Sequence, residues 1–233
     1  MRYREHRPPH QLARWLACTW ERAGDDAPVR VLPDGCIDIV WIEGEGTQIV
    51  GANTTAFLSP LPRGARVAGA RLRPGAAPPI IGVAAEALRD TRVPIEDAWG
   101  AEGERLALAL DASRDPAATL RDALLARARD ADSPDALVGE VVGLLARPRA
   151  AVADLAGELA VSERQLRRRV SVAVGYGPKR LARVLRLRLA LDAAARGDDL
   201  ARVALDAGYA DQTHFAHECR ELAGASATAL LAS

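Results

Sequence analysis

The sequence divides into two halves of different pattern, and this division limits the fold more than any other feature. Up to about residue 100, short runs rich in β-branched and apolar residues alternate with Pro- and Gly-rich segments such as 59–64 and 73–79. Regularly spaced short strands predict a small β-sandwich or barrel. From about Glu102 the chain is rich in Ala, Leu and Arg, with apolar residues at helical spacing. The sequence therefore predicts an α+β protein with more than one domain.

Three segments follow from this pattern. Residues 1–101 are expected to form a small β-barrel or sandwich of cupin-like type, in which 29–32 and 36–42 pair as a hairpin around Pro33-Asp34-Gly35. Residues 102–147 are expected to form a helical linker that could also dimerise, since Pro116 and Pro134 suit the first turns of helices. Residues 148–233 are expected to form an all-α domain.

Charge is concentrated although the chain is neutral overall. Between residues 162 and 191 there are nine basic residues and one acidic residue. A concentrated positive stretch in a neutral protein is typical of a phosphate-binding surface. The three cysteines lie far apart, which does not favour a disulfide framework or a zinc-thiolate site, and no cofactor or metal is expected. The N-terminus lacks an apolar run and no stretch suits a membrane span, so a cytoplasmic protein is expected.

Residues 152–174 have the pattern of a helix-turn-helix unit. Val152, Leu155, Ala156 and Leu159 share one helix face. After a tight connection, Ser162 and Gln165 have the spacing of a capping box that begins a second helix. In this helix the exposed face carries Arg164, Arg167 and Arg168. Arginine can hold the edge of guanine with two hydrogen bonds, so the pattern favours reading of a DNA major groove.

Residues 200–231 repeat the arrangement. Gly208-Tyr209 suits the turn and Asp211 suits the N-cap of the next helix. Between the units, about 19 residues opened by Pro178 predict a helix of roughly 28 Å. This length approaches the roughly 34 Å between successive major grooves on one face of DNA. Lys179, Arg183 and Arg186 on this helix could meet phosphates between the grooves.

The run 151–231 resembles the AraC-type DNA-binding domain, in which two helix-turn-helix units are joined by a long helix. The most specific segment is Ala204-x-x-x-Gly208-Tyr209-x-Asp211-Gln212-x-His214-Phe215, and 162–170 followed by Gly175-Tyr176-Gly177-Pro178 matches the first unit. The resemblance implies sequence-specific transcriptional control, usually activation, with a double-stranded DNA operator and RNA polymerase as partners. Departures from the family pattern occur at His217, Cys219 and Ala227.

Site residues are carried over position by position. The resemblance implies that the bases are read by two sets of side chains, namely Arg164, Arg167 and Arg168 in the first unit and Gln212, Thr213 and His217 in the second. The residues expected near DNA phosphates are Ser162, Arg169, Lys179, Arg183, Arg186, His214 and Arg220. No catalytic residues are expected.

The N-terminal region, with 32–41 and 70–78, also resembles uncharacterised domains attached to AraC-type regulators, which implies a sensory role for a small-molecule effector. Its tryptophans could line a pocket or pack in a core. The candidate pocket residues are Trp20, Cys36, Asp38 and Trp41.

Two alternatives remain open. In the first, the chain is a DNA-repair methyl acceptor in which Cys36 is the acceptor, although such acceptors use a zinc-thiolate cluster that three dispersed cysteines do not supply. In the second, the helices of 102–196 form a protein-interaction module. The salt dependence of DNA binding separates this module from a DNA-binding protein.

Overall fold

A computed structural model describes residues 3–23 and 28–232. Within these residues the N-terminal part contains a six-stranded antiparallel sheet. Its strands lie in the order β1 (Arg4–His6), β2 (Leu16–Ala23), β7 (Arg66–Leu72), β4 (Ile37–Ile42), β5 (Gly46–Val50) and β8 (Arg92–Pro94). Because β1 and β8 lie at opposite edges, the sheet is open and not closed into a barrel.

A second sheet pairs β3 (Val29–Val31) with β6 (Phe57–Ser59). The predicted hairpin between 29–32 and 36–42 is therefore wrong, because β4 pairs with β5 and β7 instead. The predicted turn does form, since Gly35 has a φ of 80° and the Asp34 carboxylate accepts a hydrogen bond of 2.9 Å from the Cys36 amide. A turn sequence specifies a change of chain direction, while the partner of each strand depends on the rest of the sheet.

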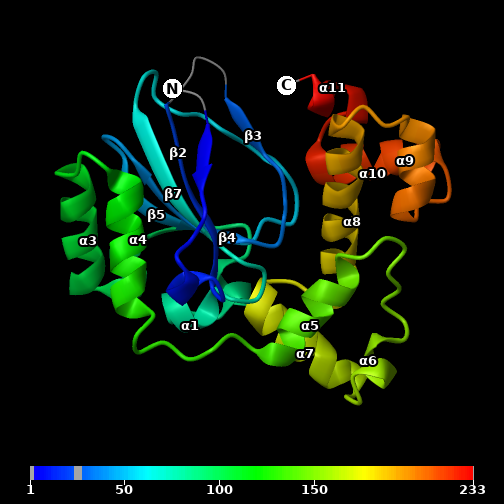
Figure 1. Ribbon diagram of the computed structural model, residues 1–233, viewed down its shortest axis with the longest axis horizontal. Helices are drawn as coiled ribbons and strands as arrows, with labels where there is room; N and C mark the ends of the chain where they lie inside the picture. Colours follow the sequence, from blue (N-terminus) through cyan, green and yellow to red (C-terminus); the bar gives the residue numbers. More distant parts are fainter. Residues whose placement is uncertain (1–2, 24–27, 233) are drawn as a thin grey trace.

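The two faces of β4 have different environments, as the alternation of side chains in a strand requires. Ile37, Ile39 and Trp41 are buried on the face covered by α3 (Ala101–Asp111) and α4 (Pro116–Arg127) (Figure 1). The Trp41 indole donates a hydrogen bond of 2.7 Å to the carboxylate of Asp111 on α3. The opposite face of β4 lies toward β3 and the long helix α8 (Pro178–Ala195).

Short helical elements complete the N-terminal part. These are η1 (His10–Leu12), α1 (Pro78–Ile81), η2 (Ala85–Leu88) and α2 (Ile95–Trp99). Ile80 and Ile81 of α1 are fully buried, and the Trp99 indole of α2 donates a hydrogen bond of 3.0 Å to the Ile81 carbonyl. The predicted α+β class is confirmed, and the N-terminal part is an open sandwich of a large and a small sheet.

The remaining chain is helical. Its elements are α5 (Ala136–Leu145), α6 (Leu155–Glu158), α7 (Glu163–Val174), α8 (Pro178–Ala195), α9 (Leu200–Ala207), α10 (Gln212–Glu218), the π-helical turn η3 (Cys219–Ala223) and α11 (Ala227–Leu231). Helix α5 contacts both α7 and α8, whereas α3 and α4 pack on the sheet side of the molecule (Figure 1). The segment predicted as a linker, 102–147, is thus divided between the two parts.

Two hydrophobic cores determine how the helices are attached. One core extends without interruption from the sheet through α5 and α7 to Val184 in the first half of α8. A separate core begins at Leu187 and holds α9, α10 and η3 against the second half of α8. None of the described helices is long and apolar enough to cross a membrane.

Candidate nucleic-acid interface and ligand cavity

The first helix-turn-helix unit consists of α6, a tight turn and α7. Ala160 adopts the left-handed conformation with a φ of 51°, and the Val161 amide donates a hydrogen bond of 2.9 Å to the Ala156 carbonyl. The predicted capping box is present, because the Ser162 hydroxyl accepts from the Gln165 amide at 3.2 Å and the Gln165 side chain accepts from the Ser162 amide at 3.1 Å. The capping box fixes where α7 begins and therefore which of its side chains face outward.

The outward face of α7 is basic. Leu166 and Val170 are buried in the core, which leaves Arg164, Arg167 and Arg168 exposed on the other side. Among the described residues none of these three arginines forms an ion pair. Their guanidinium groups are therefore available to a ligand outside the protein.

The second unit consists of α9, a turn at Gly208 and α10. Gly208 has a φ of 89°, which favours glycine. The Asp211 carboxylate caps α10 by accepting a hydrogen bond of 2.7 Å from the His214 amide. Phe215 and Cys219 are buried, and burial raises the pKa of the Cys219 thiol to about 11. The predicted base-reading residues of this unit are exposed, namely Gln212, Thr213 and His217.

Three residues predicted near phosphates are already engaged within the protein. Arg169 on α7 forms an ion pair with Asp135, the N-cap of α5. Arg183 on α8 donates hydrogen bonds of 3.0 and 2.8 Å to the buried carboxylate of Glu218 and contacts Glu221 at 2.6 Å. The hydroxyl of Ser162 belongs to the capping box. Arg169 thus joins α7 to α5, and Arg183 joins α8 to α10.

The other four predicted phosphate contacts have no carboxylate partner among the described residues: Lys179, Arg186, His214 and Arg220. Lys179 and Arg220 are exposed, and Lys179 lines a groove beside α7 together with Arg167. Arg186 lies 5.5 Å above the ring of Tyr209. The basic residues of this region therefore separate into a paired set that holds helices together and an unpaired set that faces outward.

A cavity of about 350 Å³ lies between the two sheets of the N-terminal part and α8. Most of its wall is apolar and comes from both sheets, as shown by Val29, Val40 and Phe57. Five arginines also line it, namely Arg22, Arg30, Arg71, Arg92 and Arg188. Arg188 comes from α8, so the wall of the cavity includes the long helix of the C-terminal part.

Three of the four predicted pocket residues, Trp20, Cys36 and Asp38, line this cavity. Trp41 does not, because it points to the opposite face of the sheet and is hydrogen-bonded to α3. The sequence reasoning missed the five arginines. Those on strands could have been recognised by their alternation with apolar residues, as for Arg71 in β7, but nothing local indicates that Arg188 turns toward the sheet.

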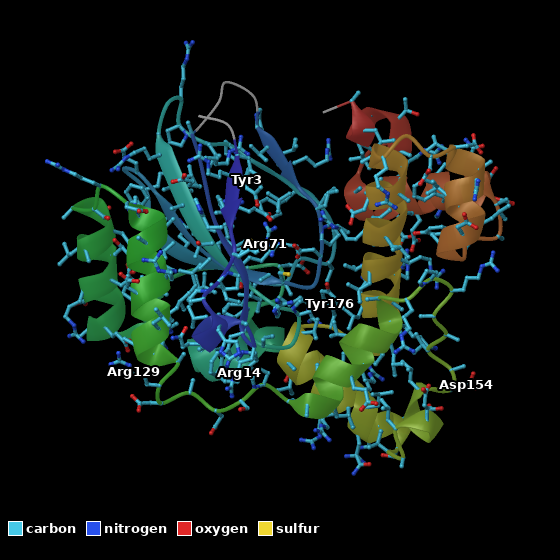
Figure 2. All side chains as sticks on the ribbon, viewed as in Figure 1. Tyr3, Arg14, Arg71, Arg129, Asp154 and Tyr176 are labelled. Carbon is cyan, nitrogen blue, oxygen red and sulfur yellow. The ribbon has the colours of Figure 1, made fainter. Side chains whose placement is uncertain are left out.

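The polar end of the cavity centres on Asp38. Its carboxylate accepts hydrogen bonds from the Trp20 indole at 3.2 Å and from the Arg71 guanidinium at 3.3 Å. Burial raises the pKa of Asp38 to about 6, and Arg71 opposes this shift. Arg71 lies on the side of the sheet that faces α8 (Figure 2).

Burial and the neighbouring Asp34 hold the pKa of the Cys36 thiol well above its usual value. The thiol is therefore protonated at neutral pH, which is the opposite of the lowered pKa that a nucleophilic cysteine requires. No group of three or more metal-ligating side chains converges within residues 3–23 and 28–232.

Both parts of the chain match known domain families. Residues 155–233 match the helix-turn-helix domain family, and residues 4–94 match a domain of unknown function (DUF6597). A search of curated proteins finds no match.

Solved structures of ToxT from Vibrio cholerae are similar over the whole chain. An apo ToxT variant has 13% identity and a TM-score of 0.50 over 91% of this chain and 96% of that chain. ToxT bound to (E)-4-(8-methylnaphthalen-1-yl)but-3-enoic acid has 11% identity and a TM-score of 0.49 over 99% of this chain and 98% of that chain. At such low identities, structural similarity shows only the fold. The first of these structures supports a two-domain fold for this chain. The chain therefore carries a C-terminal AraC-type helix-turn-helix domain, joined to an N-terminal domain of unknown function.

Proposed function

We propose that the protein is a sequence-specific DNA-binding transcription regulator in which α7 and α10 read successive major grooves. The observation that carries the proposal is that α7 and α10 are both capped helices with an exposed polar face, and that they pack in two separate cores, one reaching Val184 of α8 and the other beginning at Leu187. Helix α8 has 18 residues and is therefore about 27 Å long. This length is compatible with the roughly 34 Å between grooves on one face of DNA.

The two recognition helices have different chemistry. In α7 the planar guanidinium groups of Arg164, Arg167 and Arg168 suit the O6 and N7 acceptors of guanine. In α10 the side chains of Gln212, Thr213 and His217 form single or bidentate hydrogen bonds with weaker preference for guanine. The imidazole of His217 also lies 4.0 Å from the Glu221 carboxylate, so it is held partly by the protein.

This difference gives a testable order of effects. Arg168→Ala should lower the affinity for a recovered operator more than His217→Ala, because a bidentate contact to one base contributes about 1–3 kcal/mol. The comparison is made by fluorescence anisotropy at one salt concentration. Equal losses for the two variants would contradict the asymmetry.

The proposal is tested by recovering bound fragments of genomic DNA and measuring affinity for them over a series of salt concentrations. A protein that neutralises several phosphates should show a log-log slope of about −0.9 for each of them. A flat slope, or no enriched fragments, would instead favour a protein-interaction module.

For the N-terminal domain we propose a small-molecule effector with an apolar body and an anionic group. The apolar wall of the cavity suits the body, and Arg22, Arg30, Arg92 and Arg188 surround it with positive charge. Thermal shift with aliphatic carboxylates and matched primary alcohols tests this class. The carboxylates should raise the Tm of the wild type, and Arg188→Ala should abolish this increase. An equal increase in Tm with the alcohols would contradict an anionic effector.

Three further parts of the proposal are transcriptional activation through contact with RNA polymerase, a cytoplasmic location and a homodimeric state. A promoter fusion in the presence and absence of the protein distinguishes activation from repression. Sedimentation of the purified protein tests the dimer.

A further inference from the structure

The cavity between the two sheets has more basic than acidic groups in its wall. Among the described residues that line it, five are arginines and only Asp34 and Asp38 are acidic. Both carboxylates contact the same arginine, since the Arg71 Nε lies 3.6 Å from Asp34 and 3.3 Å from Asp38. The other four arginines form no ion pair within the described part of the chain, namely Arg22, Arg30, Arg92 and Arg188. Their positive charge is therefore left for an occupant of the cavity.

Two of these arginines meet at β3, which lies on the side of the large sheet that faces α8 (Figure 1). Arg30 belongs to β3, and its Nη1 donates a hydrogen bond of 2.9 Å to the Ala223 carbonyl of η3. Arg92 comes from β8 at the edge of the large sheet, and its guanidinium lies 4.6 Å from the centre of the Phe57 ring. Phe57 is paired with Val31, the residue that follows Arg30. Arg92 thus extends from the large sheet to the small one beside Arg30.

Arg188 joins them from α8. Leu32, two residues after Arg30, packs against the second hydrophobic core, which contains Leu187 and Ala223. Leu187 directly precedes Arg188, and both Leu32 and Arg188 line the cavity. The part of the wall where β3 meets α8 therefore carries Arg188 together with Arg30.

Arg22 is separate from this group. It lies on β2, and β7, β4 and β5 separate β2 from the β8 strand of Arg92. Four strand spacings of about 4.8 Å place the two strands roughly 19 Å apart. The Arg22 Nε donates a hydrogen bond of 3.4 Å to the neighbouring Ala23 carbonyl. Arg22 is thus an isolated charge on the far side of the same cavity.

The charge of the group around β3 selects among anionic ligands. A carboxylate has one negative charge and two oxygens, so it would leave most of the charge of three guanidinium groups unbalanced. A phosphate monoester carries a charge of about −1.5 to −2 at neutral pH and has three strong acceptor oxygens. The planar guanidinium of arginine also matches phosphate with two parallel hydrogen bonds. Three arginines therefore suit a phosphate better than a carboxylate.

We propose that Arg30, Arg92 and Arg188 form a binding site for the phosphate group of a monoester whose apolar body occupies the rest of the cavity. This inference rests on the effector proposed above for the N-terminal domain and narrows its class from one negative charge to about two. The apolar body would lie against Val29, Val40 and Phe57. Arg71 is not part of the site, because Asp34 and Asp38 already balance its charge.

The experiment is isothermal titration calorimetry of the full chain at neutral pH. The ligands are octyl phosphate, octanoate and octanol, together with inorganic phosphate. Octyl phosphate should bind with a Kd at least about tenfold lower than that of octanoate, which is the effect of one further hydrogen bond to a charged group. Inorganic phosphate should bind more weakly than octyl phosphate, because it lacks the apolar body.

Three variants test which arginines hold the phosphate. Arg92→Gln and Arg188→Gln should each weaken the binding of octyl phosphate about tenfold and reduce its advantage over octanoate. Arg22→Gln is the matched control, since it removes the same charge from the wall of the same cavity but on the far side. It should keep the wild-type ratio of the two Kd values.

Equal affinities for octyl phosphate and octanoate would overturn the phosphate site while leaving an anionic effector in place. A loss with Arg22→Gln as large as that with Arg92→Gln and Arg188→Gln would overturn the grouping around β3. Inorganic phosphate that bound as tightly as octyl phosphate would overturn the apolar body. If neither octanoate nor octyl phosphate bound, the effector class proposed for the N-terminal domain would fail as well, so the two failures are distinguishable.

Discussion

The ion pair between Arg183 and Glu218 is expected to stabilise the second helix-turn-helix unit strongly. Glu218 is 5% exposed, and its two carboxylate oxygens accept hydrogen bonds of 3.0 and 2.8 Å from the Arg183 guanidinium. Removing Arg183 would leave the buried carboxylate of Glu218 without its partner. It would also leave the carboxylate of Glu221, which Arg183 contacts as well, without this arginine. Removal of one member of a buried pair costs about 3–5 kcal/mol.

The lower end of this range applies here. The Arg183 side chain is 33% exposed, so water can replace part of what the guanidinium provides. We expect Arg183→Ala to lower the free energy of unfolding by about 3 kcal/mol. For a chain of this size the loss corresponds to a decrease in Tm of roughly 6–12 °C, measured by circular dichroism.

Arg202→Ala is the matched control. Arg202 lies on α9 in the same unit and pairs with Asp206 at 3.5 Å, but both side chains are well exposed, 81% and 65%. Exposed pairs contribute about 0–1 kcal/mol. If Arg183→Ala were no more destabilising than Arg202→Ala, the structural role of Arg183 would be refuted. A reduced salt slope for the folded Arg183→Ala protein would show that Arg183 contacts a phosphate after all.

Three other substitutions test local features. Ser162→Ala should lower the free energy of unfolding by about 1 kcal/mol in urea denaturation, because it removes the capping box of α7, and no loss would contradict that role. Gly69→Ala should destabilise by about 1–3 kcal/mol, since the added Cβ would lie 2.3 Å from the Trp20 ring, and an unchanged Tm would contradict this packing. Because the pKa of Asp38 is raised to about 6 in the folded protein, from an ordinary value of 3.8, this carboxyl favours folding increasingly as the pH falls from about 6 toward 3.8. The free energy of unfolding of the wild type should therefore rise relative to that of Asp38→Asn over this window. A difference between the two proteins that stays constant with pH would contradict the raised pKa.

The features that the sequence predicts correctly are local ones. The capping box of Ser162 and Gln165 involves residues three apart, and the N-cap at Asp211 acts on the amide of His214. Helical periodicity also identifies Leu166 as buried. These features depend on backbone geometry within one or two turns, which the residue types largely determine.

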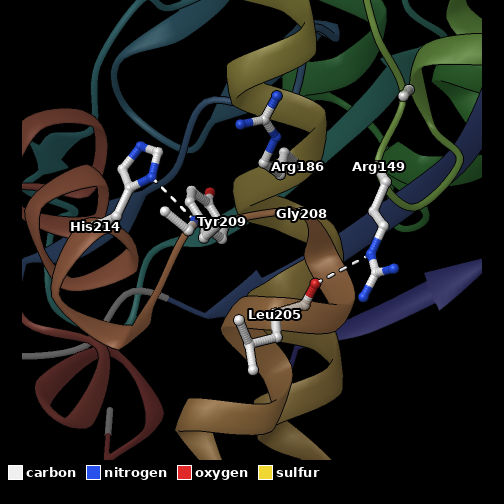
Figure 3. Close-up of a pocket in the computed structure, with 8 residues that line it drawn as sticks. Arg149, Arg186, Leu205, Gly208, Tyr209 and His214 are labelled. Atoms are coloured by element: carbon white, nitrogen blue, oxygen red, sulfur yellow. Dashed lines mark hydrogen bonds between the residues drawn. The ribbon is translucent and has the colours of Figure 1, made fainter.

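The features that the sequence does not predict depend on contacts between distant segments. Arg169 is paired with Asp135, which lies 34 residues earlier, and Arg183 is paired with Glu218, which lies 35 residues later. Periodicity shows that both arginines face away from the core but cannot show what they meet. The Arg149 Nε likewise donates a hydrogen bond of 3.3 Å to the carbonyl of Leu205, which lies 56 residues later (Figure 3).

The central claim is that one chain reads two grooves with two helices. Its most direct test is the sequence of genomic DNA fragments recovered with the wild-type protein, compared with those recovered with Arg164→Ala/Arg168→Ala and with Gln212→Ala/Thr213→Ala. The wild type should enrich a motif of two blocks whose centres lie about 10–10.5 base pairs apart, and each variant should lose the preference at a different block. A single block, or two variants that weaken the same block, would contradict the claim.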